Sequence, residues 1–248
     1  TGNTVSFSDL PIGDQDRQTL VFLQNKFELV KTPLFASEHN RMLTEMKIKV
    51  KADESIDAER RVEAQGSFLQ AQRYWLKFTM PALIEEGLKQ KIRGIADSAI
   101  LRGYEIKNVE DLDGPVVLRY TFSAPQYFKR AGTSRILGQL AAIDTSVLLK
   151  DTRLYPIESA GLSKQEERIE VELPGSLAVK YVPPRVKLDT KWFYFNCNYD
   201  IVNKSTLRFS YEYKIKERVV SVSEYAEYKK AIEEIVPLVN QQVVLERR

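Results

Sequence analysis

The chain of 248 residues is long enough for one large domain or two of ordinary size, and its 43% hydrophobic and 29% charged residues exclude a globally disordered protein. Its net charge of +3 is dispersed along the chain, which excludes a basic footprint for nucleic acid or for an anionic membrane surface. Apolar runs are short and broken by charges, so we expect no membrane span.

The first half begins with strands. Three segments have β-prone composition or alternate between apolar and polar residues: residues 19–30, 42–50 and 56–64. The last two are joined by the polar turn "ADES", which predicts a hairpin with one buried face. Two helical segments follow, with Ser67 as N-cap of the first and Pro81 at the start of the second: residues 67–79 and 81–99. With a strand over residues 116–122, they predict an antiparallel sheet with helices, in a domain over residues 1–125.

The second half is more plainly β. Four segments read as strands: residues 168–173, 177–184, 191–199 and 207–216. A helix over residues 221–236 follows, with Ser221 and Glu224 at capping-box spacing and Pro237 at its end, and residues 241–248 can form a last strand. We therefore expect a C-terminal β-sandwich with a terminal helix over residues 126–248. The whole chain is predicted to be a β-rich α+β protein.

The single cysteine, Cys197, lies in the predicted strand over residues 191–199. Alternation places it on one face with Phe193, Phe195 and Tyr199, which is typical of a small buried hydrophobe. A thiol nucleophile needs a lowered pKa, usually from a helix N-terminus or a neighbouring imidazolium. The only histidine, His39, lies in the other predicted domain, so we expect Cys197 to be structural.

No other catalytic arrangement stands out. Glu85 and Glu86 are adjacent on a predicted helix and therefore diverge, so they cannot flank one bond as a glycosidase pair does. The sequence contains no phosphate-binding glycine loop and too few cysteines and histidines for most metal sites. We expect no cofactor, no metal and no enzymatic activity of this chain alone.

Trp192 and Tyr194 are the candidate binding residues. Alternation places both on the second face of the strand over residues 191–199, where aromatic rings could stack on a sugar or a peptide. The competing interpretation is that the helix over residues 221–236 covers them, because large exposed apolar patches are rare in monomers.

Several motifs along the chain resemble a bacterial family of transglutaminase-like proteins. The opening "VSFSDLPIGDQDRQTLVF" looks like the segment that follows the catalytic core there, although Ser8 and Asp16 replace two glycines of the pattern. The segments "EAQGSFLQAQR" and "IEVELPGSLAVKYVPP" also fit, as does "VSVSEYAEYKKAI" with its aromatic pair. The matching positions are Phe7, Asp9, Leu10, Pro11, Arg17, Leu20, Val21, Gly66, Ala71, Arg73, Tyr225 and Tyr228.

The resemblance implies that this chain is a C-terminal, non-catalytic region of such a protein. Members of the family carry a papain-like Cys–His–Asp core flanked by domains of unknown function, in a periplasmic or envelope-associated chain. The core would precede Thr1, would be the partner of this region, and leaves no catalytic residue to carry over. The expected function is an accessory region that packs against the core and shapes its cleft or recruits its substrate. The alternative is an autonomous module that binds a glycan or a peptide through Trp192 and Tyr194.

Overall fold

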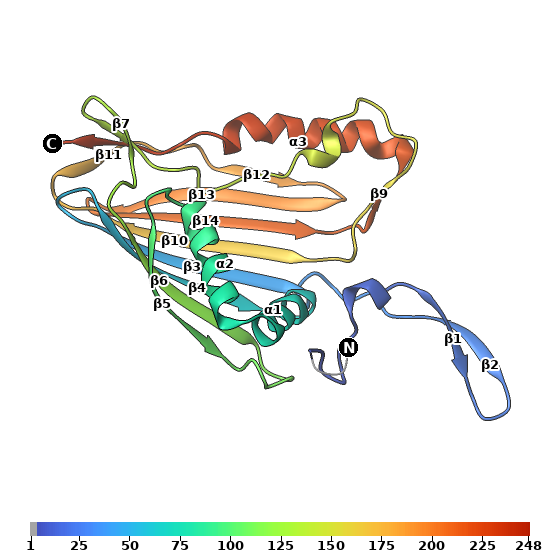
Figure 1. Cartoon of the computed structure of the whole chain (residues 1–248). Coiled ribbons are helices and arrows are strands. Elements are labelled where there is room, and N and C mark those ends of the chain that lie inside the picture. Colours follow the sequence, from blue (N-terminus) through green and yellow to red (C-terminus); the bar gives the residue numbers. More distant parts are fainter. Residues whose placement is uncertain (1–3) are drawn as a thin grey trace.

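An eight-stranded sheet forms the centre of the computed structural model, which describes residues 4–248 (Figure 1). Residues 1–3 of the first predicted domain lie outside this description. The strands, in spatial order, are β12 (Val186–Asp189), β13 (Phe193–Asn203), β14 (Thr206–Ile215), β10 (Lys164–Glu172), β3 (Arg41–Val50), β4 (Ile56–Ala64), β6 (Val116–Ala124) and β5 (Ile100–Lys107). All neighbours are antiparallel except β10 and β3, which run parallel.

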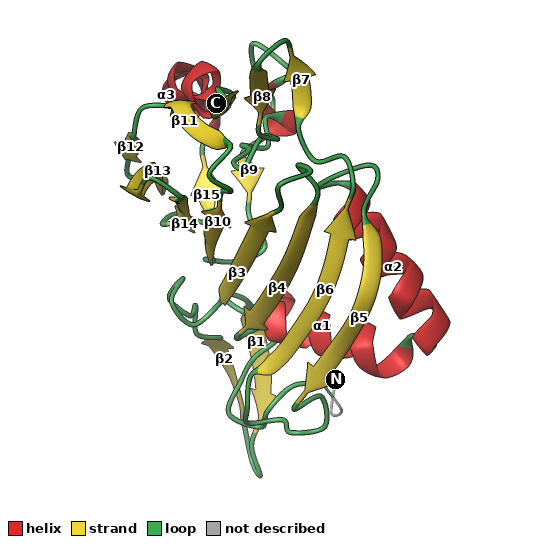
Figure 2. Cartoon of the chain, turned by 90° about the vertical axis from the view of Figure 1, so that its left-hand side faces the viewer, coloured by secondary structure: helices red, strands yellow, loops and turns green. Residues whose placement is uncertain are grey.

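The alternation of polarity in the strands gives this sheet two different faces. In β3, Met46, Ile48 and Val50 are buried, whereas the lysines between them are exposed. Strand pairing places Ile169 of β10 opposite Met46 and also opposite Phe209 of β14, so the apolar side chains gather on one face. The charged side chains gather on the other. Figure 2 shows that no helix lies in front of β3, β4, β6 and β5 on this charged face.

The sheet crosses the predicted domain boundary. Strand β3 belongs to the segment 1–125 and pairs over its length with β10, which belongs to the segment 126–248. The two halves therefore share one sheet and one contiguous hydrophobic core instead of having a sheet each. The predicted boundary, between residues 125 and 126, falls in the loop after β6.

Two groups of elements cover the apolar face. Helices α1 (Ser67–Phe78) and α2 (Pro81–Arg93) cover the β4, β6 and β5 end, with buried Leu88 and Ile92 pointing inward. Helix α3 (Tyr225–Val239) and a four-stranded sheet cover the other end. The strands of this smaller sheet, in spatial order, are β11 (Leu177–Tyr181), β16 (Val244–Arg247), β8 (Ser134–Ile136) and β7 (Lys129–Ala131). The predicted β-rich α+β class is confirmed. The C-terminal strands were expected to pack against a second sheet as a β-sandwich, and the layer that covers them consists of α3 together with the four-stranded sheet.

The remaining elements are short. They are β1 (Gln18–Phe22), β2 (Phe27–Lys31), β9 (Ile157–Glu158), β15 (Val219–Val220) and the 3₁₀ turns η1 (Ile12–Asp14), η2 (Ser146–Leu148) and η3 (Val222–Glu224). Among the described strands, β1 and β2 pair only with each other, and the hairpin projects from the body of the molecule (Figure 1).

Three local predictions differ from the structure. The strand expected over residues 19–30 is the β1–β2 hairpin, because the chain turns where the Leu23 N–H donates to the Lys26 carbonyl at 2.8 Å. The second helix ends at Arg93, before Gly94, and β5 follows it. Helix α3 continues past Pro237 to Val239, although the proline has no N–H to donate to the carbonyl four residues earlier.

A buried arginine ties the first helix to the loops around it. Arg73 of α1 is 0% exposed and donates to the backbone carbonyls of Thr4, Asp111 and Gly114, the last at 3.0 Å. These bonds fix both the start of the described chain and the "DLDGP" turn. Burial lowers the pKa of Arg73, although the carboxylates of that turn oppose the shift.

Candidate binding surface

The two aromatic residues predicted to bind a ligand lie on different sides of the sheet. Trp192 is 3% exposed and packs edge-to-face on Tyr228 of α3, with ring centroids 5.6 Å apart. Tyr194 is half-buried, and its ring lies 5.9 Å from the ammonium nitrogen of Lys187. Trp192 is covered by the C-terminal helix, as the competing interpretation predicted, and Tyr194 does not share its environment.

The separation of these residues has a local cause. The side chain of Thr190 accepts hydrogen bonds from the backbone N–H groups of Trp192 and Phe193, at 3.2 and 3.0 Å. These hydrogen bonds bend the backbone and keep Trp192 outside β13. The alternation of buried and half-buried side chains in β13 starts at Phe193. Trp192 therefore points toward α3 together with Phe193, and the period-two argument does not apply to it.

Cys197 is buried, as predicted. It is 2% exposed in the middle of β13, opposite Tyr211 of β14. Burial raises the pKa of its thiol to about 11, so the neutral thiol predominates at neutral pH. His39 hydrogen-bonds the carboxylate of Asp9 at 2.8 Å.

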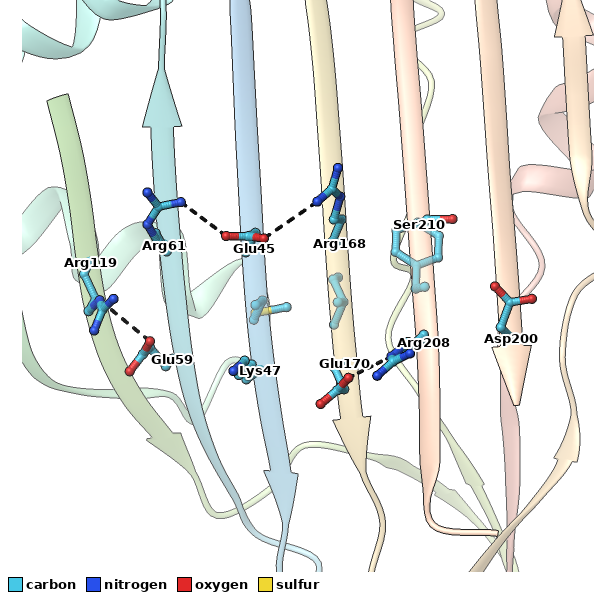
Figure 3. A pocket seen from close by; sticks show the side chains of 13 residues that line it. Glu45, Lys47, Glu59, Arg61, Arg119, Arg168, Glu170, Asp200, Arg208 and Ser210 are labelled. Carbon is cyan, nitrogen blue, oxygen red and sulfur yellow. Dashed lines mark hydrogen bonds and ion pairs between the residues drawn. The ribbon is translucent and has the colours of Figure 1, made fainter. Parts of the chain in front are cut away.

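A shallow hollow of about 530 Å³ lies on the charged face of the large sheet (Figure 3). Six neighbouring strands, from β6 to β13, contribute its charged and polar side chains. These residues are Glu45, Lys47, Glu59, Arg61, Arg119, Arg168, Glu170, Asp200, Arg208 and Ser210. We refer to this set as the charged surface.

Ion pairs between strands organise the charged surface. The carboxylate of Glu45 on β3 lies between Arg61 and Arg168, at 3.2 and 3.9 Å (Figure 3). A second pair joins Arg208 and Glu170 at 2.8 Å. Each exposed pair contributes at most about 1 kcal/mol to stability, because solvent screens it. The ion pairs are more important for recognition than for stability, because they hold donors and acceptors in a fixed pattern that a polar partner could match.

Lys47 adds an uncompensated charge to the charged surface. Within residues 4–248, its ammonium group has no ion-pair partner. The carboxylate of Asp200 accepts from the Asn198 amide at 2.8 Å. Among the described residues, Asp200 likewise has no ion-pair partner, so the hollow presents one unpaired cation and one unpaired anion beside the ion pairs, an arrangement suited to polar recognition.

Sequence reasoning assigned the charged residues of these strands to solvent faces and missed their gathering. The alternation of Glu45 and Lys47, or of Arg168 and Glu170, shows the face of each strand but not its neighbour. The parallel pairing of β10 with β3 brings the two sets together, and that pairing joins segments far apart in the chain. The alternation of charged residues along each strand was the only feature of the sequence that indicated the charged surface.

The described residues form neither a metal-binding cluster nor a membrane-spanning helix. No group of three or more His, Cys, Asp or Glu residues in 4–248 is arranged to hold a metal ion. Over the same range, no helix has the length and apolar character needed to cross a membrane.

Comparison with known proteins gives one family match, over part of the chain. Residues 136–245 match the model of a family described as a domain of unknown function with a solved structure (DUF3858). No curated protein matches the sequence. A crystal structure described as a "putative protease" from Parabacteroides distasonis ATCC 8503 is weakly similar, with a TM-score of 0.36 and 13% sequence identity. The similarity covers 46% of this chain and 23% of that one, so this chain spans about a quarter of the other protein's length.

Proposed function

We propose that this chain is a non-catalytic accessory region of an exported transglutaminase- or protease-like protein, located in the periplasm or cell envelope. In this role it packs against a catalytic core in the same polypeptide and shapes the cleft of that core or recruits its substrate. The motifs that resemble the transglutaminase-like family support the proposal. The observation that carries it is the projecting β1–β2 hairpin.

The hairpin exposes more apolar surface than an isolated protein needs. Phe22 is 78% exposed, Phe27 is 69% exposed and Leu29 is 65% exposed. An aromatic side chain buries about 150–250 Å² when it is covered. At roughly 25 cal/mol per Å², covering the two phenylalanines would contribute several kcal/mol to docking. Exposed patches of this kind mark contact surfaces in soluble proteins.

Within residues 4–248, no third strand extends the hairpin. Strands β1 and β2 form a two-stranded sheet of their own, and an isolated two-stranded hairpin is marginally stable in water. A neighbouring domain that covers the apolar side chains would stabilise it. The β1–β2 hairpin is therefore the natural contact with a catalytic core.

The test compares this chain with a longer polypeptide that includes the residues encoded upstream of Thr1. Amide hydrogen exchange of β1 and β2 should slow at least ten-fold in the longer protein. The double substitution Phe22→Ser and Phe27→Ser should remove this protection, and Tyr155→Ser, at another exposed aromatic, should leave it unchanged. An upstream sequence without a Cys–His–Asp core, or a hairpin that exchanges equally fast in both proteins, would refute the proposal.

One observation favours the alternative, a glycan- or peptide-binding module. Tyr194 stays half-buried beside Lys187, on the face of the sheet that no helix covers. If this ring stacks on a ligand, Tyr194→Ala should abolish binding on a glycan or peptide array and change the melting temperature little. Trp192→Ala should instead lower the stability by about 3–5 kcal/mol, because it leaves a cavity under α3. Equal binding by the parent and the Tyr194→Ala protein would exclude this module.

A further inference from the structure

Two more hollows lie on the opposite, helix-covered face of the large sheet. The smaller, of about 440 Å³, lies between the sheet and α1, and the larger, of about 660 Å³, lies beyond the end of α2. Arg60 of β4 lines both, so the two hollows meet at this side chain. Figure 1 shows that α1 and α2 lie over one end of this face and α3 over the other.

The smaller hollow combines apolar walls with polar groups. Its apolar side chains are Met42, Val62, Phe68, Trp75 and Leu118, and its polar ones are Thr44, Arg60, Gln72, Lys91 and Tyr120. Trp75 and Phe68 come from α1 and face β-strand residues across the hollow. Its size and composition match a site for one large apolar side chain with a polar group attached.

The polar groups at the floor include donors that the protein does not satisfy. Arg60 donates to Glu167 of β10 through Nη2, at 3.0 Å. Its Nε, and the amide Nε2 of Gln72, are buried and have no hydrogen-bond partner within residues 4–248. A buried N–H without an acceptor costs about 1–3 kcal/mol. Both side chains line the smaller hollow, so an acceptor oxygen bound there is the partner that these N–H groups lack.

The charges around the two hollows favour an anion. Arg60 and Lys91 line the smaller hollow, which has no carboxylate among its lining residues. The larger hollow has Arg60, Arg93 and Lys129 together with the carboxylates of Asp97 and Glu167. Lys91 lies on α2, exposed, with its ammonium nitrogen 5.5 Å from the centre of the Trp75 ring. Neither Lys91 nor Lys129 has an ion-pair partner in the part of the chain that the structure describes.

Tyr120 adds a further donor. Burial raises the pKa of its phenol, an effect that Glu167 reinforces and Arg60 opposes. The hydroxyl therefore stays protonated over the physiological range and can donate a hydrogen bond. Arg60 Nε, Gln72 Nε2 and the Tyr120 hydroxyl are thus three donors at the smaller hollow that an acceptor oxygen could engage.

We propose that the smaller hollow binds the free C-terminal end of a peptide whose last residue is large and apolar. The side chain of that residue packs between Phe68, Trp75 and the sheet. Its carboxylate pairs with Lys91 and accepts hydrogen bonds from Arg60 and Gln72. This site is separate from the β1–β2 hairpin and does not depend on a neighbouring catalytic core.

The test uses two peptides that differ only at the C-terminus. Acetyl-Gly-Gly-Leu-Phe with a free carboxylate and the same peptide as its amide are titrated into the full chain by calorimetry. The free acid should bind at least ten-fold more tightly than the amide, and less tightly as salt concentration rises. Equal affinity of the acid and the amide, or no binding of the acid, would overturn the proposal.

Matched variants locate the site. Ala71 of α1 is exposed and lines the smaller hollow, so Ala71→Phe should fill it and abolish binding without unfolding the protein. Ala82→Phe, at an exposed position of α2 outside the hollow, should bind normally. Lys91→Gln should weaken binding several-fold, whereas Lys89→Gln, which removes pairs with Glu85 and Glu86, should not. Normal binding by the Ala71→Phe protein would contradict the assignment even if the acid binds.

Discussion

At the scale of single residues, the stability of this fold depends on polar side chains that are completely buried. Arg73 donates hydrogen bonds to three backbone carbonyls, those of Thr4, Asp111 and Gly114. Asn40, also 0% exposed, donates to the Leu162 carbonyl and accepts from the Ser67 N–H, which joins β3, β10 and α1. Such residues tie elements together where the hydrophobic core alone would allow several arrangements.

Replacing Arg73 with methionine keeps the length of the side chain and removes its donors. The buried site then loses the three hydrogen bonds that the guanidinium group donates, so the free energy of unfolding should fall by about 3–5 kcal/mol. Urea denaturation measures the change. Arg102→Met, which removes an exposed arginine bonded to Ser123, is the matched control and should cost less than about 1 kcal/mol. Equal losses in both variants would contradict the assigned role of Arg73.

Cys197 supports a second prediction at this scale. Because its thiol is buried and its pKa is raised, a thiol reagent should label the native protein at least a hundred-fold more slowly than the urea-unfolded protein. Cys197→Ser should lower the free energy of unfolding by on the order of 1–3 kcal/mol, since it buries a hydroxyl group. Rapid labelling of the native protein would show that the side chain is accessible.

At the scale of elements, a capping box and an ion pair stabilise the start of the C-terminal helix. Ser221 and Glu224 form a capping box, as their spacing predicts, and Lys191 pairs with Glu224. The Lys191 ammonium group, followed by the N–H and hydroxyl of Ser221, lowers the pKa of Glu224 to about 2 from an ordinary value of 4.5. The ionised carboxylate therefore favours the folded state.

The sign of the pH dependence follows from this lowered pKa. Glu224 contributes its full stabilisation above about pH 4.5, and the contribution disappears as the pH falls toward 2. Glu224→Gln should thus be less stable than the parent at pH 7, and the difference should shrink progressively between pH 4.5 and pH 2. Thermal melts at several pH values measure it. Glu234→Gln, in the middle of the same helix, should show no comparable trend.

At the scale of the whole molecule, the parallel pairing of β3 with β10 makes two sequence halves into one structure. Separately expressed segments 1–125 and 126–248 would each expose the backbone of an edge strand and part of the shared core. We expect both to be unfolded or aggregated alone, and the full chain to unfold in one transition. Two independent calorimetric transitions, or a folded segment by itself, would show that the halves are separate domains.

The sequence predicts those features that arise within a few residues. The alternation in β3, β4, β10 and β14, the capping box and the burial of Cys197 all depend on near neighbours, and all were predicted correctly. The pairing of β10 with β3 depends on contacts between distant segments, so two sheets were expected instead of one. The charged surface and the hollow at Arg60 were missed for the same reason. Trp192 was placed on the wrong face because one threonine side chain bends the backbone just before β13.

The parallel pairing also affects how the chain reaches its native state. Arg41 pairs with Lys164, over a hundred positions later, so this contact closes a very long loop, whereas the strand pairs on either side of it join nearer segments. Local hairpins form rapidly, and the distant pairing is the slow step. Until it forms, β3 and β10 each have a free edge that can pair with the corresponding strand of another molecule. Refolding at high protein concentration should therefore produce strand-swapped dimers, and refolding from dilute solution should produce the monomer.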